Sequence, residues 1–454
     1  MTASTMTAPT VSEDAALLDQ LIDRAKQAGA DAADGILVRG VAVSQSQRLG
    51  ETENLEREEG QDLGLRVFIG QRQAIVSSTD LDPRAIEEMV TRAVAMAKVV
   101  PEDPYCGLAA PAQLAVDIPD LDSFDSTEPS TLELIERARR CEAAARDVRG
   151  VTNSEGAEAS WSSSRVQLAA SNGFTGGYAV SRHSLGVSVL AGEGQKMERD
   201  YDFTSTVHAA DLEDPSVVGR RAGEQAVRRL NSQKPRTSKL PIVLDPRVAN
   251  SLLGHLAGAI SGPAIARGTS FLKDKLGEQI FAADVQVLDD PHRRRGLRSK
   301  PFDAEGLATG QRTLIDNGLL TGWILDLASA RQLGLTPTGN ASRGVSGPPS
   351  PSTSNLYFAP GKLSSQALIG EIEEGFYITS MMGMGVNPVT GDYSKGATGF
   401  WIKNGVLTHP VSEATVAGNL LEMFKNLTPA DDLAFKYGVD SPTLRIDGMT
   451  IAGG

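Results

Sequence analysis

Apolar residues recur with helical spacing in two segments near the amino terminus. Between Leu17 and Ala25 they return every three or four positions, directly after Ser12 and the acidic pair Glu13-Asp14. This spacing predicts a helix with one buried stripe, and acidic residues in the first turn favour its start. Asp82-Pro83 predicts a second helix start, because a capping side chain precedes proline at the first helical position. The buried face of that second helix is expected to be Ile86, Met89, Val90, Ala93, Val94 and Ala97.

Alternating apolar and polar residues predict strands around these helices. Ile36 to Ser44 reads as one strand. Leu63 to Ile69 alternates, Gly70 turns the chain and residues 74–76 return, which predicts a hairpin. From Gly150 to His208, short alternating runs are separated by Asn-Gly and Gly-Gly pairs, a pattern typical of an antiparallel meander. The remaining predicted elements are a strand over Leu240–Leu244 and helices over Pro129–Arg146, Val217–Leu230, Pro246–Ile260 and Leu363–Glu374.

Two polar or proline-rich segments, Pro101–Pro119 and Asn231–Lys239, divide the chain. A length of 454 residues also exceeds what one hydrophobic core normally supports. We therefore predict an α+β protein with a two-part α/β amino-terminal region and a larger β-rich carboxy-terminal domain. The predicted units are an α/β domain over 1–124, a middle α+β meander domain over 125–235 and the carboxy-terminal domain over 236–454.

Composition narrows the setting in which the protein works. The net charge of −13 disfavours binding to nucleic acid or anionic membranes, because a phosphate backbone would be repelled. Only two cysteines occur, Cys106 and Cys141, which favours a reducing compartment. The longest uncharged run, Val248–Ala266, is interrupted by polar residues and glycines and reads as a buried segment. Without a recognisable signal peptide, we expect a cytoplasmic protein with no membrane contact.

Residues that bind metals are scattered along the chain. No histidine lies within five residues of another, so no helix places two imidazoles on one face. His255 lies in an apolar helical run and is expected to be a hydrogen-bonded interior residue. Asp289, Asp290 and His292 form a local cluster, but Asp-Asp-Pro is a common turn. Four arginines within His292–Arg298 form a basic loop, which we interpret as a solvated or partner-contacting segment more than a DNA site.

Other catalytic patterns are weak or absent. There is no G-x-S-x-G, and the adjacent Ser394 and Lys395 would point to opposite faces of a strand. Gly383, Gly385 and Gly391 do not fit the G-x-G-x-x-G spacing of a dinucleotide site. The sequence thus offers no recognisable nucleophile or phosphate-binding loop.

The stretch from Tyr377 to Asn387 fits peptide binding better. Methionines adapt to varied apolar side chains, and glycines let another backbone approach closely. An extended peptide is expected to add there as a strand, held by main-chain hydrogen bonds. A glycine-kinked core strand is the alternative. The candidate peptide-binding residues are Met381, Met382, Gly383, Met384, Gly385 and Asn387.

Short matches to one known family run through most of the chain in the same order. The upstream matches are Gly64-Leu65-Arg66-Val67 and Ser171-Asn172-Gly173-Phe174. The chain resembles the TldD/PmbA family, once named as modulators of DNA gyrase, over nearly its whole length. The matches in the carboxy-terminal part are Ser270-Phe271-Leu272, Asp289-Asp290-Pro291-His292, Pro301 to Gly306, Thr338-Gly339-Asn340, Gly396 to Ile402, Val416 to Leu420 and Pro442 to Gly454.

The resemblance implies a two-subunit zinc protease that degrades unfolded or flexible peptides and trims the leaders of some modified peptides. In its TldD-type subunit, a helix carries HExxxH and a cysteine near the carboxy terminus completes the metal site. Zinc lowers the pKa of its bound water, and the glutamate acts as general base.

This chain departs from that motif. Aligning Leu252-Leu253 with the family's Leu-Leu-His-Glu places Gly254 and His255 at the first histidine and the glutamate. Ala259 stands at the second histidine, and 431–442 contains no cysteine. The chain therefore resembles the PmbA/TldE-type subunit. We expect no cofactor in this chain and zinc in a TldD-type partner.

The leading hypothesis is a non-catalytic subunit that completes a peptide channel for a TldD-type catalytic subunit. A second hypothesis is a regulatory protein acting on DNA gyrase or a toxin–antitoxin system, supported by the family's older name and the basic loop. A third is a metal-independent hydrolase with an unrecognised nucleophile. Whether the chain forms a homodimer without its partner stays open.

Overall fold

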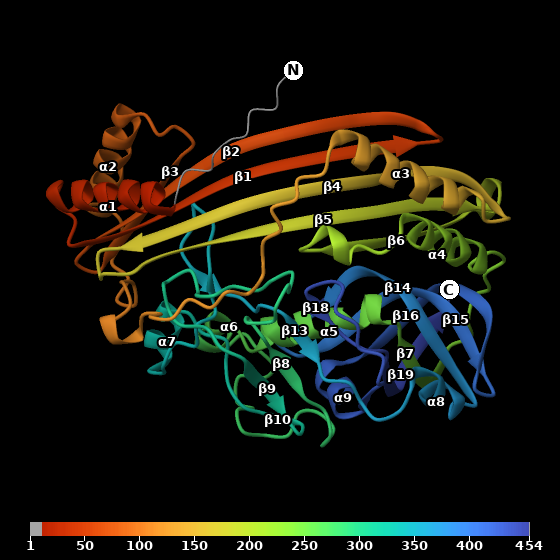
Figure 1. Ribbon diagram of the computed structural model, residues 1–454. Coiled ribbons are helices and arrows are strands. Elements are labelled where there is room, and N and C mark those ends of the chain that lie inside the picture. The colour runs from red at the N-terminus through yellow and green to blue at the C-terminus, as the bar shows by residue number, and fades with distance from the viewer. Residues whose placement is uncertain (1–10, 454) are drawn as a thin grey trace.

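The computed structural model describes residues 11–453 and has the predicted α+β architecture, with a β-rich carboxy-terminal domain. In Figure 1, long strands from the amino-terminal half extend across one side of the molecule. The carboxy-terminal elements pack beneath one face of these strands. Within 11–453, every helix is too short or too polar to cross a bilayer.

The amino-terminal half is built on one antiparallel sheet with strand order β3-β2-β1-β4-β5-β6. β1 pairs with β4 from Asp34↔Ala170 to Gln47↔Ala157, so residues from both sides of position 124 share this sheet. The predicted hairpin and the predicted meander are confirmed. The strands are β1 (Ala32–Arg48), β2 (Glu51–Ile69), β3 (Arg72–Ser78), β4 (Val151–Ala170), β5 (Thr175–Ala191) and β6 (Glu198–Thr206).

β2 begins at Glu51, twelve residues before the predicted strand. Its first ten residues are exposed, because the residues that β2 contributes to the helix–sheet core lie in its second half, at Leu63, Leu65 and Val67. With neither face buried there, alternation of apolar and polar residues is not required. The sequence pattern therefore predicted only the half of β2 that has a covered face.

Four helices cover this sheet in two pairs. α1 (Val11–Gln27) and α2 (Pro83–Ala97) pack on β1, β2 and β3, and α3 (Thr131–Arg146) and α4 (Pro215–Arg228) pack on β4, β5 and β6. Asp82 caps α2, and all six residues predicted for its buried face are buried. Ser130 and Glu133 form a capping box at the start of α3. The start of α2 was thus located correctly from its cap, whereas α3 begins two residues after its predicted start and α4 two residues before its predicted start.

The carboxy-terminal domain contains a second sheet that closes on itself. Its strand order is β16-β15-β14-β7-β19-β17, and β16 also pairs with β19. α5 (Pro246–Ala259) packs on this sheet in the largest apolar core of the described chain. The strands are β7 (Ser238–Leu244), β14 (Glu374–Val386), β15 (Asp392–Lys403), β16 (Val406–Asn419), β17 (Leu427–Pro429) and β19 (Leu444–Gly453).

Short elements complete the domain. The helix predicted over Leu363–Glu374 is shorter, because Glu374 already begins β14. A smaller sheet has the order β10-β9-β8-β13-β18, and β11 pairs with β12. The strands are β8 (Val287–Asp289), β9 (Arg312–Asp316), β10 (Leu319–Leu320), β11 (Ala341–Ser342), β12 (Ser350–Pro351), β13 (Leu356–Phe358) and β18 (Val439–Asp440). The helices are α6 (Gly262–Ala266), α7 (Leu327–Leu333), α8 (Ser365–Gly370) and α9 (Leu420–Lys425), with 3-10 turns at Pro111–Gln113, Gly194–Lys196 and Ala209–Asp211.

Candidate functional site

α5 carries the three positions that the family resemblance assigns to a zinc motif. The helix starts at the Asp245 cap, whose side chain accepts from the Arg247 N–H, and Pro246 takes the first position. Gly254 lies on the exposed face, and a Cβ added there would meet no atom within 4 Å. Ala259 is buried in the core, and His255 is half-buried between these two environments.

His255 packs against the β14–β15 hairpin. Its ring lies edge-to-face with that of Tyr393, with centroids 6.0 Å apart. Its Nε2 atom is buried and has no hydrogen-bond partner among the described residues, so the expected hydrogen bond is absent at this atom. Burial, and then the charge of Lys395, lower the pKa of His255. The imidazole is therefore held in its neutral form next to a cation.

The residues around α5 do not fit a zinc ion. A structural or catalytic zinc site needs at least three converging nitrogen, oxygen or sulfur ligands from the protein. Between residues 11 and 453, no three His, Cys, Asp or Glu side chains form a group suited to a metal ion. At α5 the only imidazole is that of His255, and Lys395 contributes a positive charge that a zinc ion would have to overcome.

Alanine substitutions at two glycines in helices, one closely packed and one in open space, test whether this face of α5 is open. Gly219, in α4, packs against α3 so closely that a Cβ would lie 2.0 Å from the Cys141 carbonyl oxygen. Gly219→Ala is expected to lower the free energy of unfolding by about 1–3 kcal/mol through overpacking. Gly254→Ala, with open space around it, is expected to raise it by about 0.5–1 kcal/mol through helix propensity. Urea unfolding of both variants measures the difference, and a loss of stability in Gly254→Ala would contradict the open-face assignment.

The candidate peptide-binding residues lie at the end of β14 and in the turn that follows. β14 pairs in parallel with β7 only at Phe376, Tyr377 and Ile378. The Asp245 N–H then bonds to the Ile378 carbonyl, and the chain turns into α5. Beyond Ile378, the β7-side edge of β14 therefore has no strand partner within the described chain. A free strand edge is the feature that strand addition requires.

The tip of this hairpin is exposed and held by its own contacts. Met382 is 63% exposed and Met384 is 94% exposed. Lys395 Nζ donates to the Gly383 carbonyl oxygen at 2.6 Å, across a register shift between Met382 and Gly385. The Asn387 side chain accepts from the Val389 N–H within the turn. The predicted residues thus form an irregular, apolar hairpin end.

The structure brings the two groups of predicted residues together through a residue that the sequence did not single out. Tyr393 Oη donates to Met381 Sδ at 3.1 Å, and the same ring contacts His255. Met381 packs against the core, whereas Met382 and Met384 are exposed. α5 and the free edge of β14 are therefore neighbours, although 122 positions separate residues 259 and 381 in the sequence.

The local acidic cluster around position 289 has its own hydrogen bonds. The buried Asp289 carboxylate accepts from Ser354 and Asn340. Asp290 accepts from the His292 N–H, as expected for the predicted turn, and the His292 ring contacts Thr309. These groups hold loops of the carboxy-terminal domain together.

The arginines of the basic loop, His292–Arg298, contact other residues of the same chain. Arg295 bridges Asp122 and Asp211, and Arg298 donates to the Thr353 carbonyl oxygen. The Arg293 guanidinium lies 3.3 Å from the centroid of the Phe435 ring. Arg294 also pairs with Asp122 at 3.5 Å, so all four arginines contact other parts of the protein, which reduces the positive charge available to a nucleic acid.

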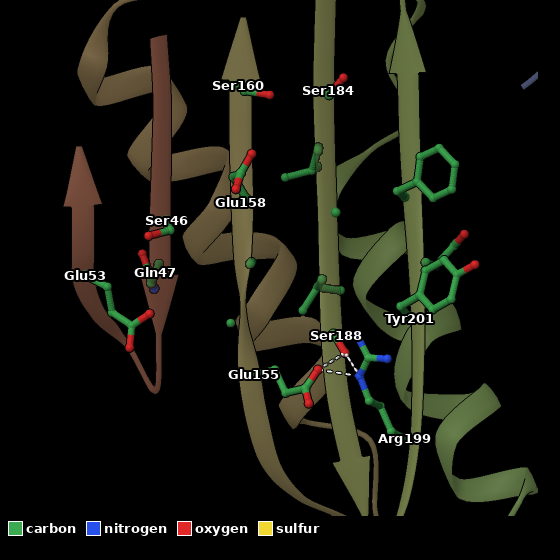
Figure 2. A pocket seen from close by; sticks show the side chains of 17 residues that line it. Ser46, Gln47, Glu53, Glu155, Glu158, Ser160, Ser184, Ser188, Arg199 and Tyr201 are labelled. Atoms are coloured by element: carbon green, nitrogen blue, oxygen red, sulfur yellow. Dashed lines mark hydrogen bonds and ion pairs between the residues drawn. The ribbon is translucent and has the colours of Figure 1, made fainter. Parts of the chain in front are cut away.

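A polar pocket of about 420 Å³ lies on the amino-terminal sheet. Residues of β1, β2, β4, β5 and β6 line it, and Figure 2 labels Ser46, Glu53, Glu158, Ser160 and Ser184 among them. Glu155 accepts from Ser188 and Arg199 at its border. Sequence reasoning missed this pocket, because each strand contributes only one or a few polar side chains to it. The other residues that line the pocket are Gln47, Gly156, Ala157, Leu185, Gly186, Val187, Tyr201, Asp202 and Phe203.

Comparisons with known proteins match this architecture along its length. Family models described as the PmbA/TldA metallopeptidase domain 1, central domain and C-terminal domain match residues 33–97, 124–230 and 237–453. The metalloprotease PmbA of Escherichia coli O157:H7 is 38% identical over 442 residues, which cover 96% of each chain. The chain belongs to the PmbA/TldD family of metalloproteases.

Further relatives place the chain within the PmbA/TldD family. A Haemophilus influenzae metalloprotease TldD homologue is 26% identical over 298 residues, covering 59% of this chain and 61% of that protein. The crystal structure of a candidate modulator of DNA gyrase from Bacteroides thetaiotaomicron superposes with a TM-score of 0.90 at 27% identity, over 97% of this chain and 99% of that chain. TldE from Thermococcus kodakarensis shares the fold, with a TM-score of 0.87 at 22% identity over 96% and 100% of the two chains.

Proposed function

We propose that this chain is the non-catalytic subunit of a TldD–TldE-type metalloprotease complex and presents extended peptides to a zinc-bearing TldD-type partner. The observation that carries the proposal is the donor set on α5. Of Gly254, His255 and Ala259, only the histidine has a side chain able to coordinate a metal, and it stands at the glutamate position. Its Lys395 neighbour adds a repulsive charge.

The degree of similarity to known relatives supports the PmbA/TldE subtype. The chain is more similar, and over a greater length, to a relative named PmbA than to the relative named TldD. Both cysteines are free, as expected for a subunit that works in the reducing cytoplasm. In this proposal the chain itself holds no cofactor.

The peptide-handling role rests on the free edge of β14 beside α5. An unfolded peptide added at this edge would gain main-chain hydrogen bonds that do not depend on its sequence. The exposed Met382 and Met384 would contact its side chains, since methionine adapts to many apolar shapes. This arrangement suits a subunit that accepts many flexible substrates.

Reconstitution tests the proposal. The purified chain, a TldD-type subunit from the same organism and their mixture are each incubated with a flexible peptide and with a reduced, alkylated protein. We expect no hydrolysis by this chain alone and rapid hydrolysis by the mixture. Zinc-dependent hydrolysis by the lone chain would overturn the assignment.

A variant of the partner provides the matched control. Replacing the glutamate of the partner's HExxxH motif by glutamine removes its general base while leaving its metal ligands in place. The mixture is then expected to lose hydrolysis completely. Activity that persists in this mixture would assign the catalytic group to the present chain and support a metal-independent hydrolase.

A further inference from the structure

A second cavity, of about 310 Å³, lies where the amino-terminal sheet meets the carboxy-terminal domain. β6 and α4 form one side of it, and the start of α5 with β14 and β15 forms the other. It adjoins the polar pocket of Figure 2, because both are lined by Tyr201, Asp202 and Phe203. The residues that line it are Asp200, Tyr201, Asp202, Phe203, Arg221, Gln225, Arg228, Asp245, Arg247, Tyr377, Thr379, Phe400, Leu407, Lys436 and Tyr437.

Three polar groups in this cavity lack hydrogen-bond partners among the described residues. Arg247 binds the Asp200 carboxylate with both Nη atoms, and its buried Nε has no hydrogen bond, since the nearest carboxylate oxygen, of Asp245, is 4.0 Å away. Arg221 binds Asp202 and Glu213 through Nε and Nη1, and its buried Nη2 has none. Thr379 is 7% exposed, and its Oγ1 is also unsatisfied. Buried donors without partners are costly, so a ligand with acceptor oxygens would be favoured.

The charged side chains that line the cavity indicate the charge of the ligand that it would bind. Four cations face the cavity, Arg221, Arg228, Arg247 and Lys436, against the three anions Asp200, Asp202 and Asp245. The anions already have partners: Asp200 binds Arg247, Asp202 binds Arg221 and Lys436, and Asp245 accepts from Tyr377 Oη. Glu213 also pairs with Arg221 and Lys436, and Arg229 also pairs with Asp200, so these charges form one network. A negatively charged group on the ligand would pair with Arg228, which lies outside this network.

Among the four cations that line this cavity, Arg228 has no ion pair with a described residue. Its guanidinium stacks on the Phe400 ring at 4.7 Å instead. Two further aromatic rings of the lining, Phe203 and Tyr437, meet edge-to-face with centroids 5.4 Å apart. The cavity therefore combines donors for an anion with aromatic walls for an apolar group attached to it.

We propose that this cavity binds the carboxylate of a peptide. A carboxylate only accepts hydrogen bonds and can receive several donors at once. Thr379 lies on β14 at the start of the free edge, two residues before Met381. The choice of a peptide as the carrier rests on the proposed function, whereas the carboxylate follows from the unsatisfied donors and from Arg228, which has no ion pair among the described residues. Its source is either the free carboxy terminus or an acidic side chain.

Calorimetric titration of the full-length chain alone tests this site with three probes. They are N-acetyl-Ala-Ala-Phe with a free carboxylate, the same peptide as its amide, and N-acetyl-Ala-Glu-Phe-amide. At least one acid is expected to bind about tenfold or more tightly than the neutral amide, the difference typical of a charged hydrogen bond. The tighter acid identifies the source of the carboxylate. Equal affinity for all three probes would overturn the proposal.

Variants then locate the site. Thr379→Val keeps the side-chain shape and removes the hydroxyl, so it is expected to weaken acid binding about tenfold and leave amide binding unchanged. Arg228→Gln is expected to weaken acid binding as well. Thr415→Val, on an exposed position of β16, is the matched control and should bind like the unmodified chain. Acid affinities unchanged in both cavity variants would show that the carboxylate binds elsewhere.

These outcomes are separable from the proposed function. Binding is measured on the lone chain, whereas cleavage needs the TldD-type partner. A mixture that cleaves peptides while the lone chain shows no carboxylate preference would overturn the cavity assignment alone. A lone chain that prefers the acid while the mixture fails to cleave would overturn the subunit assignment alone.

Discussion

Replacement of Asp34 by asparagine is expected to lower the free energy of unfolding by about 3–5 kcal/mol. Asp34 lies on β1 and is 2% exposed. Its carboxylate binds Arg66 on β2 and Arg343 from the carboxy-terminal domain, and both of these side chains are almost fully buried. Burial opposes ionisation of Asp34, but the two guanidinium groups outweigh it and lower its pKa. Without the carboxylate, two buried cations lose their counterion.

The Asp34→Asn variant also tests how the two halves of the molecule are joined. Val345, two residues after Arg343, packs on β2 at Gly64, where an added Cβ would lie 2.2 Å from the Val345 carbonyl oxygen. Urea unfolding measures the loss, with Glu136→Gln as the control. Glu136 pairs with Arg139 at 2.8 Å on the surface of α3, and its loss is expected to leave the midpoint unchanged. Equal midpoints for the two variants would contradict the importance of the buried triad.

Replacement of Glu305 by glutamine is expected to remove a large pH dependence of stability. Burial, and then the neighbouring Asp303, raise the pKa of Glu305 to about 8. In the unfolded chain the group titrates near its ordinary value of about 4.3. Because the folded state favours the protonated form, its contribution is fully present below pH 4 and is lost as the pH rises through about 8. The loss amounts to at most about 5 kcal/mol.

Unfolding midpoints at pH 5 and pH 9 measure this effect. The unmodified chain should be markedly less stable at pH 9, and Glu305→Gln should reduce that difference. Glutamine keeps an oxygen that can accept from the Leu327 N–H, as Glu305 does. Glu224→Gln, on the exposed face of α4, serves as the control. The same pH dependence in both variants would show that another group is responsible.

Local signals in the sequence were sufficient for much of the fold. The cap at Asp82, the stripe of α1 and the alternation in Leu63–Ile69 each predict an element without reference to distant residues, and all three are confirmed. The α+β class followed from signals of this kind along the whole chain. The short strands β8 to β13 could not be predicted, because each has two to five residues and depends on partners far along the chain.

The candidate site was less accessible to sequence reasoning. The α5 positions and the hairpin residues were identified separately, but their contact through Tyr393 depends on how β15 packs on α5. Tyr393 itself carries no motif. The cavity proposed to bind a carboxylate has its unsatisfied donors on α4, α5 and β14. These elements are far apart in the sequence, so no local motif contains more than one of the donors. Such sites are defined by tertiary packing and require the structure.

The proposed function requires that this chain binds no zinc, so its zinc content when purified alone is the decisive measurement. The purified chain is equilibrated with excess zinc, dialysed against metal-free buffer and analysed by plasma mass spectrometry, with a TldD-type subunit treated in parallel. We expect close to one zinc ion per TldD-type subunit and essentially none per molecule of this chain. One tightly held zinc ion in this chain would overturn its assignment as the non-catalytic subunit.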